Sequence, residues 1–319
     1  MATPGDHGEA TGALPLRMLV VVNPHASSTT SELRSQVLAE LGASYRVEAA
    51  QTTHQGHAIE LSRRAAADGY DVVVALGGDG TINEVANGLA GTATALGCLP
   101  GGATNVYCRM LGIPRDMPAA TALLIDAAGA WDPKQLDVGR VNDRWFTFAA
   151  GVGLDAGAVA RVDRRPRLKA RWGPWFFAGM GLVTFFADYL RKPPALEVHA
   201  GGRTIPAVSA LFQNGSLYTY FRQHPIVLVP DGGLQSGDIG GVALTRATLL
   251  DLPPVLWRAL TGRRPVAGHR SVEAIPDGPV VVVRSVDGRA IPVQVDGDHI
   301  GNVLEARFSL RPGGLRVVC

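Results

Sequence analysis

The chain has 319 residues, enough for two domains with sizeable cores, and its 46% hydrophobic and 18% charged residues are typical of a soluble globular protein. A formal net charge of +2 is too small for a protein that binds nucleic acid through bulk electrostatics. Cys98, Cys108 and Cys319 form no CxxC pair, which favours a reducing cytoplasm.

The first segments along the chain are a tail and an alternating region. Residues 1–15 lack the basic start and apolar core of a secretory signal, and their Gly, Thr and Pro content predicts a disordered tail. Residues 16–140 alternate between strand-like and helix-like segments, which predicts a doubly wound, mostly parallel α/β domain. The expected strands are Arg17–Val22, Tyr45–Ala50, Asp71–Leu76 and Ala95–Leu99, and the expected helices are Ser31–Leu41, His57–Asp68, Thr81–Leu89, Asn105–Leu111 and Met117–Ala128.

The remaining residues, 141–319, have a different character. Asn142-Asp143 is a hairpin signal between two strand-like runs, and Gly, Asp and Pro turns separate many later strand candidates. We predict a second, antiparallel β domain, a sandwich with helices at Trp172–Leu190 and Ala247–Leu260. Its other expected strands are Leu196–Ala200, Ala207–Gln213, Ile226–Val229, Ile239–Thr245, Pro279–Arg284, Ile291–Val295, Ala306–Leu310 and Leu315–Val318.

The segment Gly77–Val85 reads GGDGTINEV and directly follows the apolar run Asp71–Leu76. Glycines allow a close approach of the backbone to a ligand, and a helix N-terminus presents unpaired N–H groups to an anion. The Asp79 carboxylate would repel a bound phosphate unless a metal ion lay between them. Because Mg²⁺ is usually held by one or two carboxylates plus substrate phosphates, the segment predicts a nucleoside triphosphate site with Mg²⁺. An ordinary Gly-rich turn is the simpler alternative.

Three other segments fit a phosphoryl-transfer site. Asn23–Ser28 and Pro100–Asn105 follow two other expected strands, and both offer amides, hydroxyls and backbone N–H groups at the sheet edge where ligands bind. Asp296-Gly297-Asp298 is a tight acidic turn between two late strands, although such a turn by itself is more often only a hairpin.

Together these segments resemble the lipid kinase family that contains diacylglycerol, sphingosine and ceramide kinases, in its soluble bacterial form. The resemblance runs from about Arg17 to the C-terminus. The GGDGTxNEV pattern of the family is matched throughout. Other family patterns are matched at Asn23-Pro24 (NPxSG), Thr52 before Gly56-His57-Ala58 (G-[DH]-A), Pro100, Gly102, Thr104 and Asn105 (PxGTxND), Gly151–Ala156 (GxGxDA) and Asp296–Asp298 (DGE, with Asp for Glu).

The chain also departs from the family pattern. Ala26, Ala103 and Val106 replace motif residues in the N-terminal half. Gln235, Ser236 and Gly240 stand where bacterial members have the Asp residues that hold a structural Mg²⁺. We therefore expect that structural metal to be absent.

The resemblance implies transfer of the γ-phosphoryl group of ATP to a lipid hydroxyl, most simply that of diacylglycerol to give phosphatidic acid. Asp298 is implied as general base and Asp79 as the second catalytic residue, with Asp79 and Asp137 toward Mg²⁺. For Asp137 a turn-capping role is an equal alternative. The residues assigned to nucleotide binding are Asn23, Pro24, Ser27, Thr52, Gly77, Gly78, Asp79, Gly80, Thr81, Asn83, Glu84, Gly102, Thr104 and Asn105.

The segment Arg161–Phe186 predicts where the protein meets its lipid. Residues 161–171 contain six basic residues and one acidic residue, and residues 172–187 contain six aromatic residues and no charge. Sixteen uncharged residues are too few to span a bilayer, for which about 20 are needed. An anionic membrane surface is the expected partner, and a buried helix with a solvated basic turn is the alternative. The expected location is cytoplasmic with peripheral membrane association, and a homodimer is left open.

Two other functions compete with a lipid kinase. NAD kinases share the GGDGT loop, but their Thr-Gly-Ser-Thr-Ala-Tyr pattern is missing from this sequence. A nucleotide-binding or lipid-binding pseudokinase is the second alternative, because several motif positions are altered and a fold does not guarantee a function.

Overall fold

The computed structural model describes residues 15–26, 30–164, 176, 179–189, 195–230 and 232–319. Four parallel strands lie at one end of a large sheet in the order β2 (Arg46–Gln51), β1 (Arg17–Val22), β3 (Val72–Gly77) and β4 (Ala95–Pro100). All six residues of β3 are buried because helices cover both faces of the sheet. The helices are α1 (Ser31–Leu41), α2 (His57–Ala67), α3 (Asp79–Leu89), α4 (Val106–Met110) and α5 (Met117–Gly129).

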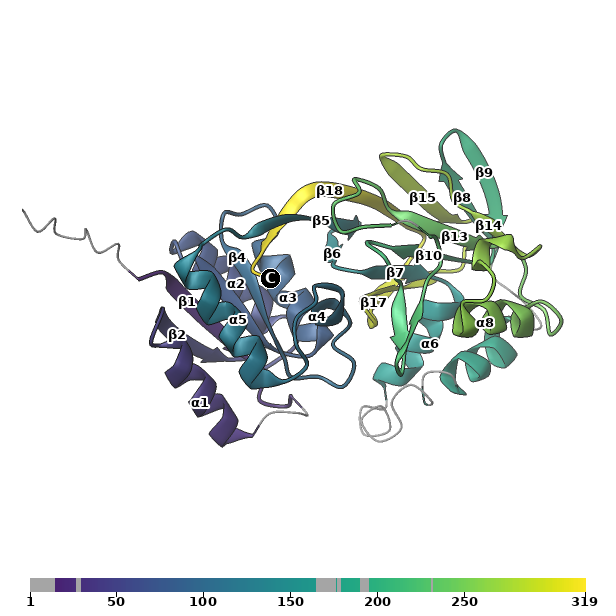
Figure 1. Ribbon diagram of the computed structural model, residues 1–319. Helices are drawn as coiled ribbons and strands as arrows, with labels where there is room; N and C mark the ends of the chain where they lie inside the picture. The colour runs from purple at the N-terminus through teal and green to yellow at the C-terminus, as the bar shows by residue number, and fades with distance from the viewer. Residues whose placement is uncertain (1–14, 27–29, 165–175, 177–178, 190–194, 231) are drawn as a thin grey trace, which may run out of the picture.

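The helices pack in two pairs, α1 against α5 and α2 against α3, with the sheet between the pairs (Figure 1). Capping residues fix where two of these helices begin. The hydroxyl of Thr30 accepts the N–H of Leu33 at α1, and the carboxylate of Asp116 accepts the N–H of Ala119 at α5. The predicted doubly wound α/β region is confirmed, with element ends within about two residues of those expected.

The second half is antiparallel, as predicted. One sheet has the order β14-β13-β10-β7-β16-β17 within the described residues, and it packs against the far end of the large sheet. The rings of Phe212 and Phe308 stack across this interface with centroids 3.9 Å apart. The strands are β5 (Lys134–Val141), β6 (Arg144–Phe146), β7 (Ala149–Val152), β8 (Leu196–Ala200), β9 (Arg203–Ala207), β10 (Ser209–Gln213), β11 (Thr219–Phe221), β12 (His224–Ile226), β13 (Gly240–Leu244), β14 (Val272–Ala274), β15 (Val280–Ser285), β16 (Ile291–Val295), β17 (Asp298–Val303) and β18 (Glu305–Val317).

Helical elements of the second half differ from the expected ones. The first is α6 (Leu154–Asp163), which the sequence patterns did not predict. The expected helix at 172–190 lies partly outside the described residues, and its described end is the π-helical turn Phe185–Tyr189. The last helix, α8 (Leu252–Thr261), begins later than expected because Thr248 and Asp251 form a turn, with 2.7 Å between Thr248 Oγ1 and Asp251 Oδ2. A short 3-10 turn, Val266–Gly268, follows it.

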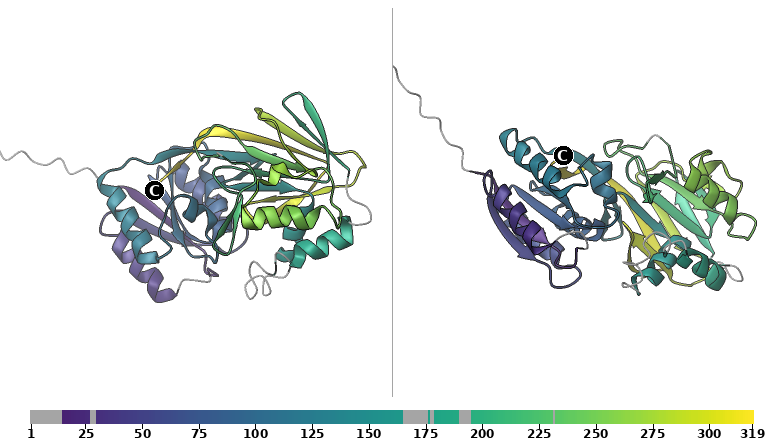
Figure 2. Two further views of the ribbon diagram at one scale, coloured as in Figure 1. Left: turned by 45° about the vertical axis from the view of Figure 1, so that its right-hand side comes forward. Right: turned by 60° about the horizontal axis from the view of Figure 1, so that its bottom comes forward.

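The strand β18 joins the two halves (Figure 2). It pairs antiparallel with β15 and β5, and at its far end Val317 lies beside Leu96 of β4. Two separate strands were expected here, but an irregularity between Arg311 and Leu315 bends one continuous strand instead. The C-terminus thus returns to the sheet of the first half. In the described residues, no helix combines the length and apolar composition needed to cross a bilayer.

Candidate active site

Two glycine-rich loops lie at the base of the site. The turn from β3 to α3 and the turn from β4 to α4 touch through backbone, and Gly101 N–H donates to the carbonyl of Gly77 over 2.8 Å. A methyl group placed on Gly102 would lie 2.6 Å from the Cα of Gly78, so neither loop has room for a side chain there. The motif glycines are therefore required by contact between the two loops, which leaves backbone N–H groups of the α3 N-terminus at the sheet edge.

Asn23 and Thr81 tie a third loop to these two. The amide Nδ2 of Asn23 donates to Thr81 Oγ1 over 3.1 Å, and its Oδ1 accepts the N–H of His25. Asn23 follows β1 and Gly77 ends β3, so the loops lie where the strand order reverses. Ligands of doubly wound sheets bind at this point, which agrees with the predicted nucleotide site.

Asp79 lies at the start of α3, and its carboxylate also faces the start of α4. Its Oδ1 accepts the N–H of Tyr107 over 3.1 Å. Burial raises the pKa of Asp79 to about 6, while the N–H groups of Val106 and Tyr107 oppose that rise. The nearby Asp296 raises the pKa of Asp79 and Arg109 lowers it. A cation bound beside Asp79 would therefore compete with a proton near neutral pH.

The side chains of two residues assigned to nucleotide binding, Glu84 and Asn105, hold the protein framework. The Glu84 carboxylate accepts the N–H groups of Gly56 and Ala58 at 2.8 and 3.1 Å, which caps α2. Asn105 has a φ of 48° and closes its own loop through two hydrogen bonds to Gly102. Thr52 N–H donates to the carbonyl of Val22.

Three further residues were assigned to nucleotide binding. Pro24 follows Asn23 in the β1–α1 loop, and its carbonyl accepts from Arg34. Thr104 is half-buried in the β4–α4 loop. Ser27 lies outside the described residues.

Asp296 connects the two halves of the molecule. Its buried carboxylate accepts the N–H groups of Thr147, Phe148 and Ala149, the hydroxyl of Thr147 and the amide of Asn83, at 2.7 to 3.0 Å. Burial raises the pKa of Asp296, and the backbone N–H groups oppose it. Asn83 was assigned to the nucleotide, but its side chain instead holds the acidic turn onto α3.

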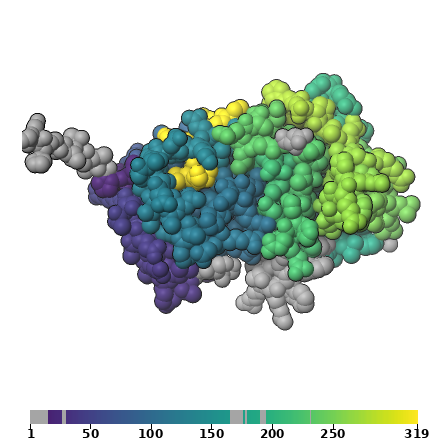
Figure 3. Space-filling view, in the orientation of Figure 1, coloured from purple at the N-terminus to yellow at the C-terminus, as the bar shows by residue number. Residues whose placement is uncertain are grey.

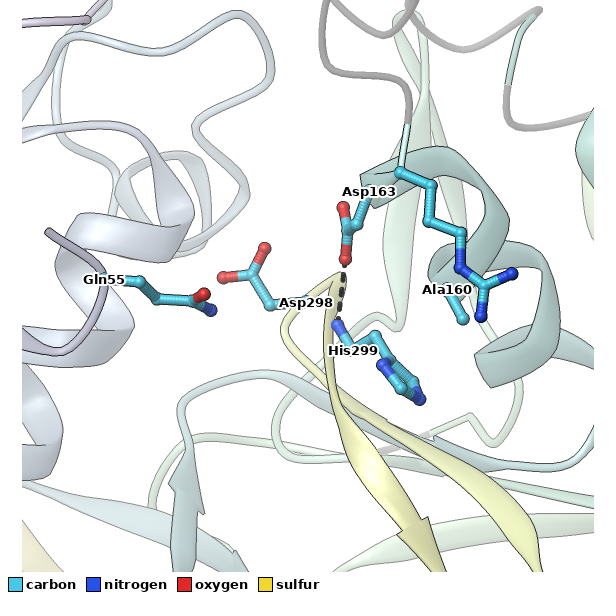
Figure 4. A pocket seen from close by; sticks show the side chains of 6 residues that line it. Gln55, Ala160, Asp163, Asp298 and His299 are labelled. Carbon is cyan, nitrogen blue, oxygen red and sulfur yellow. Dashed lines mark hydrogen bonds between the residues drawn. The ribbon is translucent and has the colours of Figure 1, made fainter.

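Asp298 lies at the start of β17, where it reaches the nucleotide loop. A methyl group placed on Gly80 would lie 2.8 Å from Asp298 Oδ2. Asp298 also lines a cavity of about 400 Å³ with Gln55, Ala160, Asp163, Arg164 and His299. Figure 4 shows its carboxylate pointing into the space between Gln55 of the first half and Asp163 of α6. The fold thus brings together the predicted base and the predicted phosphate loop, which are more than 200 residues apart in the sequence.

A buried polar triangle lies behind this turn. Tyr218 OH donates to Asp155 Oδ2 over 2.6 Å, and Gln294 Nε2 lies 2.9 Å from the same oxygen and 2.8 Å from the tyrosine oxygen. Gln294 Oε1 accepts the N–H of Gly297, the residue before Asp298. Burial raises the pKa of Asp155. The triangle therefore fixes the backbone that carries Asp298.

A cation that the sequence did not indicate, Arg144, lies beside the acidic turn. Its Nη2 donates to Asn83 Oδ1 over 2.8 Å. Burial lowers the pKa of Arg144, and the negative charges of Glu84, Asp298 and Asp296 oppose that effect. Its position after a hairpin turn gave no sequence signal, because an arginine there is usually solvated.

Asp137 has backbone partners on both of its carboxylate oxygens. Oδ2 accepts the N–H of Gly237 and Oδ1 accepts the N–H of Gly313, each over 2.8 Å. These contacts fit the turn-capping alternative. Nearby, Gln235 Nε2 donates to the carbonyl of Gln135, so a neutral amide lies where a metal ligand stands in the family pattern.

The site fits a Mg²⁺ ion that is completed by phosphates and does not fit a cage of protein ligands. Among the described residues, no three His, Cys, Asp or Glu side chains gather as a metal cluster. The donor set at the loop is the Asp79 carboxylate beside backbone N–H groups, which is the arrangement that Mg²⁺ shares with nucleotide phosphates.

Comparison with known proteins agrees with this geometry. Residues 17–141 match the family model described as the diacylglycerol kinase catalytic domain. A diacylglycerol kinase of Bacillus subtilis (strain 168) is 30% identical over 227 residues, which cover 69% of this chain and 70% of the relative. The chain belongs to the diacylglycerol kinase family. It is accordingly an ATP-dependent kinase of the lipid kinase type.

A further relative and two solved structures match almost the whole chain. A diacylglycerol kinase of Staphylococcus aureus (strain bovine RF122 / ET3-1) is 27% identical over 302 residues, which cover 92% of this chain and 89% of the relative. The crystal structure of a diacylglycerol kinase from Bacillus anthracis str. Sterne has a TM-score of 0.67 at 18% identity and covers 95% of this chain and 96% of its own. A second structure from that organism reaches a TM-score of 0.72 at 21% identity over the same shares of the two chains. These structures support the two-part fold.

Proposed function

We propose that this kinase transfers the γ-phosphoryl group of ATP, with Mg²⁺, to the free hydroxyl of diacylglycerol at an anionic membrane surface, giving phosphatidic acid. The observation that carries the proposal is that the Asp298 carboxylate lies where a Gly80 side chain would otherwise be. A carboxylate that can hold the proton of an acceptor hydroxyl lies beside the loop that can hold the phosphates of the donor.

In the proposed mechanism, the backbone N–H groups of the β3–α3 loop bind the phosphates and orient the γ-phosphoryl group toward the cavity. Asp79 would hold Mg²⁺ together with the phosphates, and the ion would offset the negative charge of the transferred group. Asp298 accepts the proton of the lipid hydroxyl as that oxygen attacks phosphorus, and the bond from phosphorus to the ADP oxygen breaks. Arg144, on the same side as Asp298, adds positive charge near the reacting groups.

The protein must also reach a lipid substrate. We propose that residues 161–186 contact the bilayer from the cytoplasmic side, with their basic residues toward anionic headgroups. The described part of this segment supports a mixed role. Phe185 is buried and Arg161 pairs with Asp188 over 2.7 Å, whereas Leu182, Val183 and Phe186 are exposed.

The test is a substrate screen with ATP labelled at the γ-phosphate and purified full-length protein. Diacylglycerol, monoacylglycerol, ceramide and sphingosine are offered separately in detergent, with NAD as the acceptor of the competing enzyme class. We expect label in phosphatidic acid that depends on added Mg²⁺. Label in NADP or in a sphingoid product would contradict the proposed acceptor, and tight ATP binding without any labelled product would favour the pseudokinase.

A further inference from the structure

The helix α8 is apolar on both faces. Its inner face packs on the core through Leu252, Val255 and Ala259. Its outer face presents Leu256, Trp257 and Leu260, which are 53%, 46% and 39% exposed. Leu249 and Leu250, in the turn before the helix, are 53% and 78% exposed. A surface helix normally has polar residues on its outer face, so this one is built to meet an apolar surface.

The charged residues around this patch are almost all basic. Residues 246–270 contain five arginines and one acidic residue, Asp251, which is buried and paired with Arg270. Arg246, Arg263 and Arg264 are exposed at the ends of the apolar stretch. Leucines and a tryptophan flanked by arginines match the two layers of an anionic bilayer, its acyl boundary and its charged headgroups.

We propose that α8 and the preceding turn, residues 249–261, form a membrane-docking face for anionic bilayers, separate from residues 161–186. The proposal rests on the proposed lipid acceptor. Figure 3 shows residues near 250–265, in yellow-green, at the surface of the β-rich half. Asp298, at the start of β17, belongs to the same half. The outer face of α8 inserts at the headgroup boundary, and Arg263 and Arg264 contact headgroups.

The experiment compares the full-length wild type with Leu256→Ser/Trp257→Ser/Leu260→Ser. Vesicles of phosphatidylcholine mixed with phosphatidylglycerol are sedimented with each protein, and vesicles of pure phosphatidylcholine give the uncharged reference. We expect the triple variant to lose at least about tenfold in partition to anionic vesicles and a similar factor in activity on vesicle-borne diacylglycerol. Activity on detergent-dispersed short-chain diacylglycerol should stay near that of the wild type.

The matched control is Val286→Ser/Leu304→Ser, which removes two exposed apolar side chains, 54% and 57% exposed, from the turns after β15 and β17. This control should bind vesicles as the wild type does. Brominated lipid should also quench the Trp257 emission, read as wild type minus Trp257→Phe. Arg263→Gln/Arg264→Gln should weaken binding mainly at low salt.

Equal partition of the triple variant and the wild type would overturn the docking face. A wild-type dimer that the triple variant dissociates in light scattering, with unchanged vesicle binding, would identify the patch as a subunit interface and would also overturn the proposal. Loss of vesicle binding in a protein that phosphorylates none of the offered lipids would support α8 docking and contradict the proposed function alone.

Discussion

The two carboxylates of the site, Asp79 and Asp298, are held by different kinds of structure. Asp79 is fixed by neighbours that are local to the first sheet: a short glycine loop, a buried strand and the start of α4. Asp298 is fixed from a distance, since its turn is held by Asn83 of α3 and by the polar triangle around Gln294. The donor side, where ATP would bind, is thus shaped mainly by backbone groups. The acceptor side, where the lipid hydroxyl would bind, is held by a network of side chains.

The two sides of the site should differ in how well they tolerate side-chain substitutions. Backbone N–H groups in a packed loop survive most side-chain changes, and here Gly78, Gly101 and Gly102 lie against backbone of the facing loop. A side-chain network fails when one buried partner is removed, because the remaining polar groups lose their hydrogen bonds in a dry interior. Substitution of a supporting side chain, as opposed to Asp79 or Asp298 itself, should therefore damage the acceptor side more than the donor side.

The largest expected effect is that of Asp79→Asn. We expect turnover to fall by about 10³-fold or more, because the variant lacks the charge that holds Mg²⁺ against the phosphates. Secondary structure should be unchanged, since an asparagine oxygen still accepts the N–H of Tyr107. Steady-state rates and circular dichroism measure both. Activity near that of the wild type would remove Asp79 from the donor side.

Asp296→Asn should damage the acceptor side and the fold together. The amide nitrogen takes the place of one carboxylate oxygen, so it faces either the donors of Thr147 and Asn83 or those of Phe148 and Ala149. Hydrogen bonds to a charged group, worth about 1.5–3 kcal/mol each, are then lost or weakened. We expect lower stability to urea and a fall of about 10²-fold in kcat, since Asp298 moves with the turn. The KM for ATP should change little. A selective loss of ATP binding would show that the acidic turn belongs to the donor side.

The pKa of Asp79, raised to about 6, predicts a pH dependence. The rate at low Mg²⁺ should fall about tenfold for each pH unit below 6, because a protonated Asp79 cannot bind the metal. More Mg²⁺ should move this limb to lower pH. Without metal, the free energy of unfolding contributed by Asp79 should be present below the unfolded pKa of about 3.9 and be lost as the pH rises through 6. A rate that is flat between pH 5 and 7 would contradict the assignment.

The smallest expected effect is that of Tyr218→Phe. It removes one hydroxyl from the triangle but leaves Gln294 to hold Gly297 and Asp155. We expect kcat to fall by a factor of about 5 to 10, with the KM for ATP unchanged, because Tyr218 acts on Asp298 only through Gln294 and Gly297. Gln294→Leu should cost more than Tyr218→Phe. The reverse order would show that Tyr218 contacts the substrate directly.

Features that depend on neighbours in the chain could be predicted from the sequence, whereas features that depend on tertiary packing could not. Strands and helices of the first half follow from apolar runs and glycine turns, and the site loops follow from residues that are adjacent in the chain. The partners of Asp296 could not be predicted, because Asn83 and Thr147 meet it only through tertiary packing. For the same reason Glu84 looked like a nucleotide ligand but caps α2. The return of β18 to β4 was also missed, because strand patterns do not encode which strands pair.

The most direct test of this division is to measure ATP binding and phosphoryl transfer separately in Asp298→Asn. Calorimetry should give a Kd for Mg²⁺ and ATP within about twofold of the wild-type value, while single-turnover transfer to diacylglycerol falls by about 10²–10⁴-fold. Asp298→Glu, which restores the residue of the family pattern, should recover part of the transfer. A large loss of nucleotide affinity in Asp298→Asn, or transfer at the wild-type rate, would contradict the assignment of Asp298 to the acceptor side.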